Sequence, residues 1–266
     1  MDYSLDDLRK AYKALGIKKG STVLFKSNLF NLGFFTSNKK NDILNAHFDI
    51  LENLIDLTRG NIVVMTSSTY LCNTDTPYDH ENTKSERGIF SEYVREKKNT
   101  IRSFHPFMSY AAIGKDSEYI CSNVSNVAWG DNSVKERLIN FDTKCLSIGI
   151  DARLTCSTVH HAEYNIDVPY RYLKMFNHPI KTRTNIINKK YYMHVLYKNL
   201  NIKRNRNIKI FEHFLDEGFE LRKIKIGRNY GYSYDIKDFY ESTIRALKKD
   251  IFIWLDEKPN LKKIKK

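Results

Sequence analysis

The chain has 266 residues, 41% of them hydrophobic and only five of them proline, which excludes a disordered protein and allows a sizeable buried core. Lysine and arginine outnumber aspartate and glutamate by 44 to 31, and the formal charge of +13 favours anionic partners. The chain has no apolar run of membrane-spanning length, no signal-peptide pattern and no CxxC pair among its four cysteines, so we expect a cytoplasmic protein without contact with a membrane.

Helical and strand patterns alternate over the first 165 residues. Apolar residues recur at helical spacing over 4–15 and 42–57, and the polar stretch 71–87 between later elements predicts a long loop. Further helices are predicted in "GIFSEYVREKKN", "NSVKERLINFD" and "STVHHAEYNI", and strands in "TVLFKS", "NIVVMTSS" and "KCLSIGI". This alternation is typical of a layered α/β domain.

The pattern changes after Pro169. The β-branched and aromatic residues of "KTRTNIINKKYYMHVLYKNL" predict a hairpin with a polar apex. A helix ending at Gly218, a strand, and a closing amphipathic helix in "DIKDFYESTIRALKKDIFIWL" follow. We therefore expect one domain over residues 1–266, with a β-rich insertion at 181–209.

The segment "STVHHAEYN" contains the best candidate for chemistry. On a helix, His160 and Glu163 share a face, and a carboxylate beside an imidazole fixes its tautomer and raises its basicity. The hydroxyls of "TCST" and the free amides at the start of the helix offer donors for an oxyanion. The pair is therefore a candidate general base, although most His-x-x-Glu pairs are simple surface pairs.

Two other interpretations of this segment are possible. A metal site would use His160, His161 and Glu163, but adjacent helical residues point about 100° apart, and the chain has no HExxH motif. A nucleophilic Cys156 could pair with His160 across one helical turn, although a buried cysteine is usually a small apolar residue. We expect no metal and treat the cysteine route as a minor alternative.

Two further segments could approach a ligand. "SFHPFMSYAAIGK" combines a His-Pro pair with small residues that permit close backbone contact, and "LFKSNLFNLG" could present amides to a phosphate. Neither segment is diagnostic alone. The chain has no P-loop and no dinucleotide-binding glycine motif.

The order of these short motifs is more specific than any one of them. "ALGIKKGSTVLFKSNLFNLG", "VVMTSS", "IRSFHPFMSYAAIG", "WGDNSVKERL" and "CLSIGIDARLTCSTVHHAE" follow one another in the register of the aminoglycoside 3-N-acetyltransferase family. The chain resembles that family over about residues 5–165, and more loosely in its closing strand and helix. The resemblance implies a three-layer α/β/α fold with a mixed central sheet and transfer of acetyl from acetyl-CoA to a sugar amine.

The resemblance also assigns roles to residues. His160 matches the catalytic histidine, Glu163 its partner, and Ser157 a threonine whose hydroxyl lies near the thioester carbonyl. Ser27, Asn28 and Leu29 match one coenzyme-binding loop, and His105 and Ser109 match a second. The chain departs from the family where Lys26 and Met108 replace histidines, Asn28 replaces a serine, and Ala128-Trp129 replaces an apolar-Phe pair. We expect Glu163 to raise the pKa of His160, which then deprotonates the attacking amine in a ternary complex.

The charge of the chain predicts the class of acceptor. Aminoglycosides are polycations, whereas a chain of charge +13 attracts the phosphates of coenzyme A and of a nucleotide-linked (dTDP- or UDP-type) amino sugar, as used in surface-polysaccharide synthesis. A set of basic residues in the predicted insertion could hold this acceptor or a second subunit of a homodimer: Lys181, Arg183, Lys189, Lys190, Lys203, Arg204 and Arg206. The alternatives are an aminoglycoside-modifying enzyme and, more remotely, a nucleic-acid-binding protein, for which no motif is present.

Overall fold

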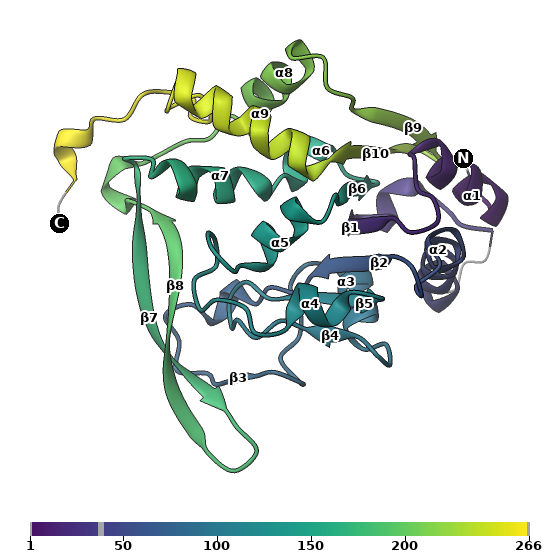
Figure 1. The fold of residues 1–266 in the computed structure, drawn as a ribbon, viewed down its shortest axis with the longest axis horizontal. Coiled ribbons are helices and arrows are strands. Elements are labelled where there is room, and N and C mark those ends of the chain that lie inside the picture. The colour runs from purple at the N-terminus through teal and green to yellow at the C-terminus, as the bar shows by residue number, and fades with distance from the viewer. Residues whose placement is uncertain (1, 37–39, 265–266) are drawn as a thin grey trace.

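A mixed seven-stranded sheet forms the centre of the computed structural model, which describes residues 2–36 and 40–264 (Figure 1). The order across the sheet is β4-β5-β2-β1-β6-β10-β9, in which β1 is parallel to β2 and β6 and the other pairs are antiparallel. The strands are β1 (Thr22–Ser27), β2 (Asn61–Met65), β4 (Ile101–Arg102), β5 (Tyr110–Gly114), β6 (Lys144–Ile148), β9 (Arg222–Ile226) and β10 (Asn229–Asp235).

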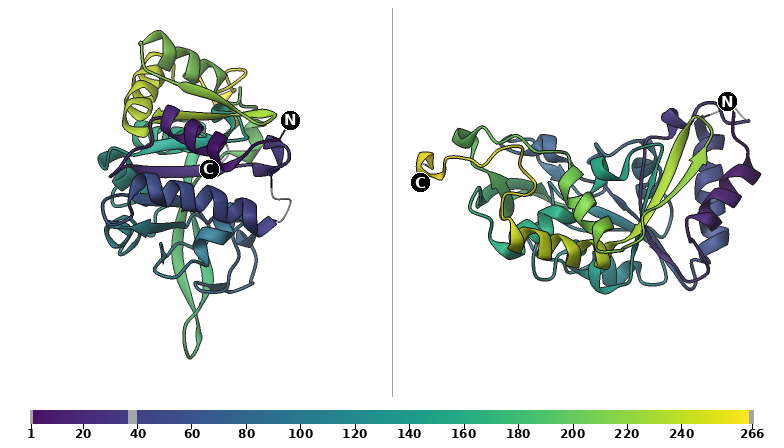
Figure 2. Two further views of the ribbon diagram at one scale, coloured as in Figure 1. Left: turned by 90° about the vertical axis from the view of Figure 1, so that its right-hand side faces the viewer. Right: turned by 90° about the horizontal axis from the view of Figure 1, so that it is seen from above.

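Helices cover both faces of the sheet (Figures 1 and 2). Alternate residues of one strand point to opposite faces, so Val23 and Phe25 lie in one hydrophobic core and Leu24 in the other. The first core is covered by α1 (Leu5–Ala14), α2 (Lys40–Ile55) and α3 (Ile89–Arg95). The second is covered by α4 (Ser117–Cys121), α5 (Val134–Asn140), α6 (Ala152–Thr155), α7 (Thr158–Ile166), α8 (Ile208–Asp216) and α9 (Ile236–Lys249). The predicted three-layer α/β/α fold with a mixed sheet is confirmed.

Local sequence explains where the predicted helices begin and end. Ser4 caps α1: its Oγ accepts the Asp7 amide, and the Asp7 carboxylate accepts the Ser4 amide. Gly218, at φ +84, follows the last turn of α8 as predicted, because glycine adopts the left-handed conformation without strain.

A long hairpin projects from the body of the protein (Figures 1 and 2). It consists of β7 (Arg171–Lys181) and β8 (Ile186–Leu196). The short strand β3 (Tyr78–Asp79), which lies within the predicted long loop, pairs with β7. The predicted insertion, 181–209, does not coincide with this hairpin: it contains only the last residue of β7, and it includes the short helix η3 (Lys198–Leu200) and the irregular segment that leads into α8. Buried and exposed residues alternate only weakly along both strands, because much of the hairpin is exposed.

The chain end differs from the prediction in two respects. The sequence pattern did not reveal β10, which pairs with β6 and β9 and has Gly231 in its middle. The closing helix ends at Lys249 rather than continuing through Trp254, whose side chain is buried in the turn that follows. The side chains of this turn pack against the body, so apolar spacing alone suggested a longer helix.

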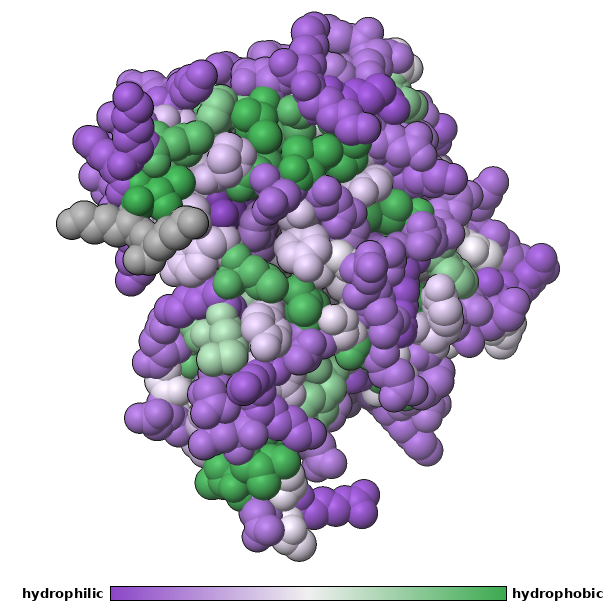
Figure 3. All heavy atoms as spheres, turned by 60° about the vertical axis from the view of Figure 1, so that its left-hand side comes forward, coloured by the Kyte–Doolittle hydropathy of each residue, from purple (hydrophilic) through white to green (hydrophobic). Residues whose placement is uncertain are grey.

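The surface is mainly hydrophilic on the face drawn in Figure 3, with apolar residues in separate patches. One patch lies at the lower end of this view. Ile186 and Ile187, which begin β8 near the apex of the hairpin, are exposed. In the described part of the chain, no helix combines the length and apolar character that crossing a bilayer requires.

Candidate active site

A cavity of about 1350 Å³ lies at the carboxyl ends of the three parallel strands. It is lined by Lys26 and the residues that follow β1, by Met65 at the end of β2, and by residues that follow β6. Carboxyl ends of parallel strands meet at one edge of a sheet, which is the usual place for a ligand in an open α/β fold. The start of α7, the end of β8 and the segments 86–91 and 202–207 form further parts of the wall.

His160 and Glu163 are brought together as predicted. Nδ1 of His160 lies 3.3 Å from Oε2 of Glu163, one turn along α7, and His160 lines the cavity. The Glu163 side chain is fully buried, and Nε of Arg171 lies 2.9 Å from the same oxygen. Arg171 was not predicted as a site residue, because the contact depends on how the start of β7 packs against α7.

The protonation states suit a base. Burial alone would raise the pKa of Glu163, but the charge of Arg171 and the hydrogen bond from His160 lower it below its ordinary value. An ionised carboxylate only accepts, so Nδ1 of His160 carries the hydrogen and Nε2 keeps the lone pair. Burial lowers the pKa of His160 below its ordinary value, against the raising effect of Glu163. The upward shift predicted from the sequence is therefore wrong, because desolvation outweighs the carboxylate.

Ser157 lies at the start of α7, beside Lys26. Lys26 Nζ donates to Ser157 Oγ over 3.1 Å and also to the Thr155 carbonyl. Ser157 Oγ therefore accepts from Lys26 and also lies beside the buried Tyr110 hydroxyl, and Ser157 lines the cavity. The lysine that replaces the family's histidine thus takes part in the site.

The two alternative interpretations of "STVHHAEYN" find no support. Cys156 is buried, and burial raises the pKa of its thiol to about 11, which disfavours a thiolate nucleophile. His161 is also buried, and its Nδ1 accepts the Gly130 amide at 3.3 Å, so it has a structural role. The described residues contain no cluster of three or more metal-ligating side chains.

The first predicted coenzyme loop does line the cavity. Ser27, Asn28 and Leu29 all contribute to its wall, and the backbone N–H of Asn28 donates to the Ile148 carbonyl. Gly149, at φ +69, lets the backbone after β6 pass close to this loop: a Cβ there would lie 2.3 Å from the Asn28 carbonyl oxygen. The loop is thus held against the turn that follows β6.

The second predicted loop lies behind the cavity wall. Nδ1 of His105 accepts the amides of Phe107 and Met108, and Ser109 donates to the Thr66 carbonyl. Both His105 and Ser109 are buried and neither lines the cavity, whereas Met108 does. Their placement fits shaping of the wall better than direct contact with coenzyme.

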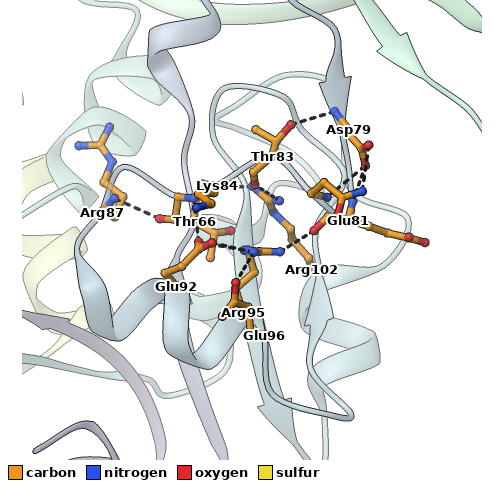
Figure 4. A network of polar contacts seen from close by, with 12 residues as sticks. Thr66, Asp79, Glu81, Thr83, Lys84, Arg87, Glu92, Arg95, Glu96 and Arg102 are labelled. Carbon is orange, nitrogen blue, oxygen red and sulfur yellow. Dashed lines mark hydrogen bonds and ion pairs between the residues drawn. The ribbon is translucent and has the colours of Figure 1, made fainter. Parts of the chain in front are cut away.

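A half-buried arginine, Arg102, holds a loop that leads to another part of the wall (Figure 4). The guanidinium of Arg102 donates to the carbonyls of His80, Thr83 and Thr66. It thereby attaches the predicted long loop to β2, and this loop leads to Arg87, which lines the cavity. Sequence reasoning could not find this role, because the acceptors are backbone carbonyls.

The lining of the cavity is strongly basic. Two acidic residues, Glu86 and Asp256, line it together with seven basic ones: Lys26, Arg87, Arg153, Arg171, Lys203, Arg204 and Arg206. Three of these belong to the basic set singled out in the sequence, namely Lys203, Arg204 and Arg206. The other members of that set, Lys181, Arg183, Lys189 and Lys190, lie on the hairpin outside the cavity lining.

The family model for aminoglycoside 3-N-acetyltransferases matches residues 24–248. The chain belongs to this family. Membership makes it an acetyl-CoA-dependent N-acetyltransferase, and the basic cavity, with the predicted loop Ser27–Leu29 in its wall, suits the phosphates of that co-substrate.

Solved structures of the family have the same fold. The aminoglycoside acetyltransferase AAC(3)-Xa matches with a TM-score of 0.78 at 18% identity, covering 93% of each chain. AAC-IIIb in a binary complex with CoASH matches with 0.77 at 18% identity, covering 97% of this chain and 100% of that one. The YokD protein of Bacillus subtilis matches with 0.76 at 22% identity, covering 92% and 99%. A search of curated protein sequences finds no significant match.

Proposed function

We propose that this family member acetylates the amine of a phosphate-bearing sugar, a dTDP- or UDP-type nucleotide-linked amino sugar, in a ternary complex with acetyl-CoA. The observation that carries the proposal is the charge of the cavity, where seven basic residues face two acidic ones. Coenzyme A accounts for part of this excess. A second anionic ligand accounts for basic residues beside His160, at the reacting end of the site.

The amine must lose a proton before it can attack. His160 Nε2 accepts a proton from the acceptor's ammonium group, and the free amine attacks the thioester carbonyl. Arg171 keeps Glu163 ionised, and Glu163 holds the Nδ1–H, so the imidazolium formed is stabilised beside a carboxylate. When the C–S bond breaks, the thiolate of coenzyme A leaves and takes the proton from His160. The attacking nitrogen releases its second proton to solvent, which leaves the neutral amide.

The attack creates a negative charge on the thioester oxygen. We assign its stabilisation to the Ser157 hydroxyl, with Lys26 behind it, and to the first amides of α7. Lys26 donates to Ser157 Oγ and so polarises the hydroxyl toward the oxyanion. In this mechanism no acyl group is attached to the protein, in keeping with the raised pKa of Cys156.

Aminoglycosides are the second candidate acceptors, because solved relatives such as AAC(3)-Xa are aminoglycoside acetyltransferases. Against this, a polycation brought beside Arg171 and Arg204 meets like charge.

The two candidates are separated by release of the coenzyme thiol with each acceptor. A nucleotide-linked amino sugar should give a kcat/KM at least about 100-fold above that of a gentamicin-type aminoglycoside. Added salt should lower the value for the anionic sugar, because it screens attraction. Turnover of the aminoglycoside without turnover of any nucleotide-linked amino sugar would refute the proposed acceptor.

A further inference from the structure

Two arginines pack against a tryptophan beside His160, and their positive charge is only partly compensated. We propose that Arg171, Arg204 and Trp254 form an anion subsite that holds a phosphate of the acceptor next to His160. This inference rests on the proposed function, because it identifies the part of the cavity that recognises an anionic amino sugar.

Trp254 is the centre of this arrangement. The guanidinium carbons of Arg171 and Arg204 lie 5.3 and 5.1 Å from the centre of its ring system. The centre of the His160 ring lies 5.0 Å from the same point. All four side chains line the cavity, and Trp254 is only 3% exposed. The indole ring of Trp254 thus lies against both arginines and against the proposed base.

The positive charge of the two arginines is only partly compensated. Glu163 pairs with Arg171, while Arg204 has no hydrogen-bond or ion-pair partner for its guanidinium among the described residues. Asp256, two positions after Trp254, also lines the cavity but makes no ion pair with Arg204 in the described part of the chain. Burial, and then the like charge of Arg171, lower the pKa of Arg204. Two guanidiniums therefore share one carboxylate.

A donor inside this cluster is also free. Arg171 is 7% exposed; its Nη1 donates to the His194 carbonyl at 3.1 Å, and its buried Nη2 has no hydrogen-bond partner among the described residues. Leaving such a donor unpaired is costly. A phosphate oxygen is the partner that suits two arginines, because guanidinium groups bind phosphate through paired N–H donors.

The phosphate at this position belongs to the acceptor rather than to coenzyme A. The pantetheine arm of the coenzyme separates its pyrophosphate from the thioester by a long chain. With the thioester at His160 and Ser157, the coenzyme phosphates bind far from His160, whereas Trp254 packs directly against that residue. A sugar phosphate next to the reacting amine fits the shorter distance.

Trp254 itself can report binding, because the chain has only two tryptophans. In a Trp129→Phe background, inorganic pyrophosphate should change the emission of Trp254 in a saturable manner. Arg204→Gln should weaken this binding at least about tenfold, and Arg204→Lys, which keeps the charge, should weaken it less. Arg183→Gln, the same change on the hairpin outside the cavity lining, should have no effect.

Kinetics then identify the source of the phosphate. Arg204→Gln should raise KM for a nucleotide-linked amino sugar at least about tenfold and leave KM for acetyl-CoA unchanged. Saturating coenzyme A should not displace pyrophosphate. Pyrophosphate binding to Arg204→Gln with wild-type affinity would overturn the subsite, and so would displacement by coenzyme A together with a raised KM for acetyl-CoA.

The two proposals can fail separately. If pyrophosphate binds at Trp254 in an Arg204-dependent manner while no phosphorylated amino sugar is acetylated, the proposed function fails and the anion subsite stands. If such a sugar is acetylated equally well by Arg204→Gln, the proposed function stands and the subsite fails.

Discussion

His160 and Glu163 are one helical turn apart, so their contact could be predicted from the sequence, whereas the environment of the contact could not. Arg171 reaches Glu163 through the packing of β7 against α7, and Trp254 reaches His160 from a turn after α9. Spacing within a helix is set by local geometry. Contacts between distant elements, and the desolvation that they cause, depend on the whole fold. The direction of the His160 pKa shift was therefore predicted wrongly.

The imidazole of His160 should titrate below 6.5, because burial disfavours its charged form. Because the pKa of the imidazole is lower in the folded than in the unfolded protein, the imidazole is neutral at pH 7. As the pH falls below 6.5, the unfolded state binds the proton more readily, so the free energy of unfolding decreases. An NMR titration of the imidazole C–H signals, with His160→Ala to assign the peak, measures this pKa.

Glu163→Gln provides the matched comparison. It removes the carboxylate that raises the pKa, so the His160 signal should titrate lower still. A His160 pKa above 6.5 in the wild-type protein would contradict the conclusion that desolvation outweighs the effect of Glu163 on this pKa.

At the scale of elements, strong local patterns predicted α1, α2, β1, β2, β6 and α7, because amphipathic spacing and buried apolar runs were clear. The sequence pattern did not predict β7, along which burial alternates weakly, or β10, which pairs with the distant strand β6. The loop after β1, which we predict to bind coenzyme, follows one of the correctly predicted strands, and its position depends on close approach to the turn after β6.

Gly149→Ala should displace this loop. A Cβ at Gly149 would lie 2.3 Å from the Asn28 carbonyl oxygen, and φ is +69, so we expect a loss of stability above the roughly 1–2 kcal/mol of left-handed strain alone. KM for acetyl-CoA should rise several-fold because Asn28 and its neighbours line the cavity.

Gly218→Ala is the control, since Gly218 has φ +84 and no atom within 4 Å of a Cβ. It should lose only the roughly 1–2 kcal/mol of left-handed strain, with unchanged KM. Denaturant unfolding and steady-state kinetics on both variants measure these effects. Equal behaviour of the two variants would show that the Gly149 contact does not position the loop.

At the scale of the whole molecule, net charge indicated the character of the cavity but not where the charge lies. The basic set chosen from the sequence divides in the structure: residues 203–206 provide cavity-lining residues, while the members on the hairpin lie elsewhere. Basic residues from distant segments, such as Arg87 and Arg153, join them only in the fold. The expected homodimer and cytoplasmic location stay predictions.

Direct transfer with His160 as base is the central claim, and turnover by His160→Ala tests it most directly. The variant should lose about 10²–10⁴-fold in kcat while its affinity for acetyl-CoA stays within about twofold, because the imidazole acts on the acceptor's proton. Cys156→Ala should keep near-wild-type turnover. Full activity of His160→Ala would contradict the claim. So would loss of activity in Cys156→Ala together with an acetylated Cys156 thiol in the wild-type protein.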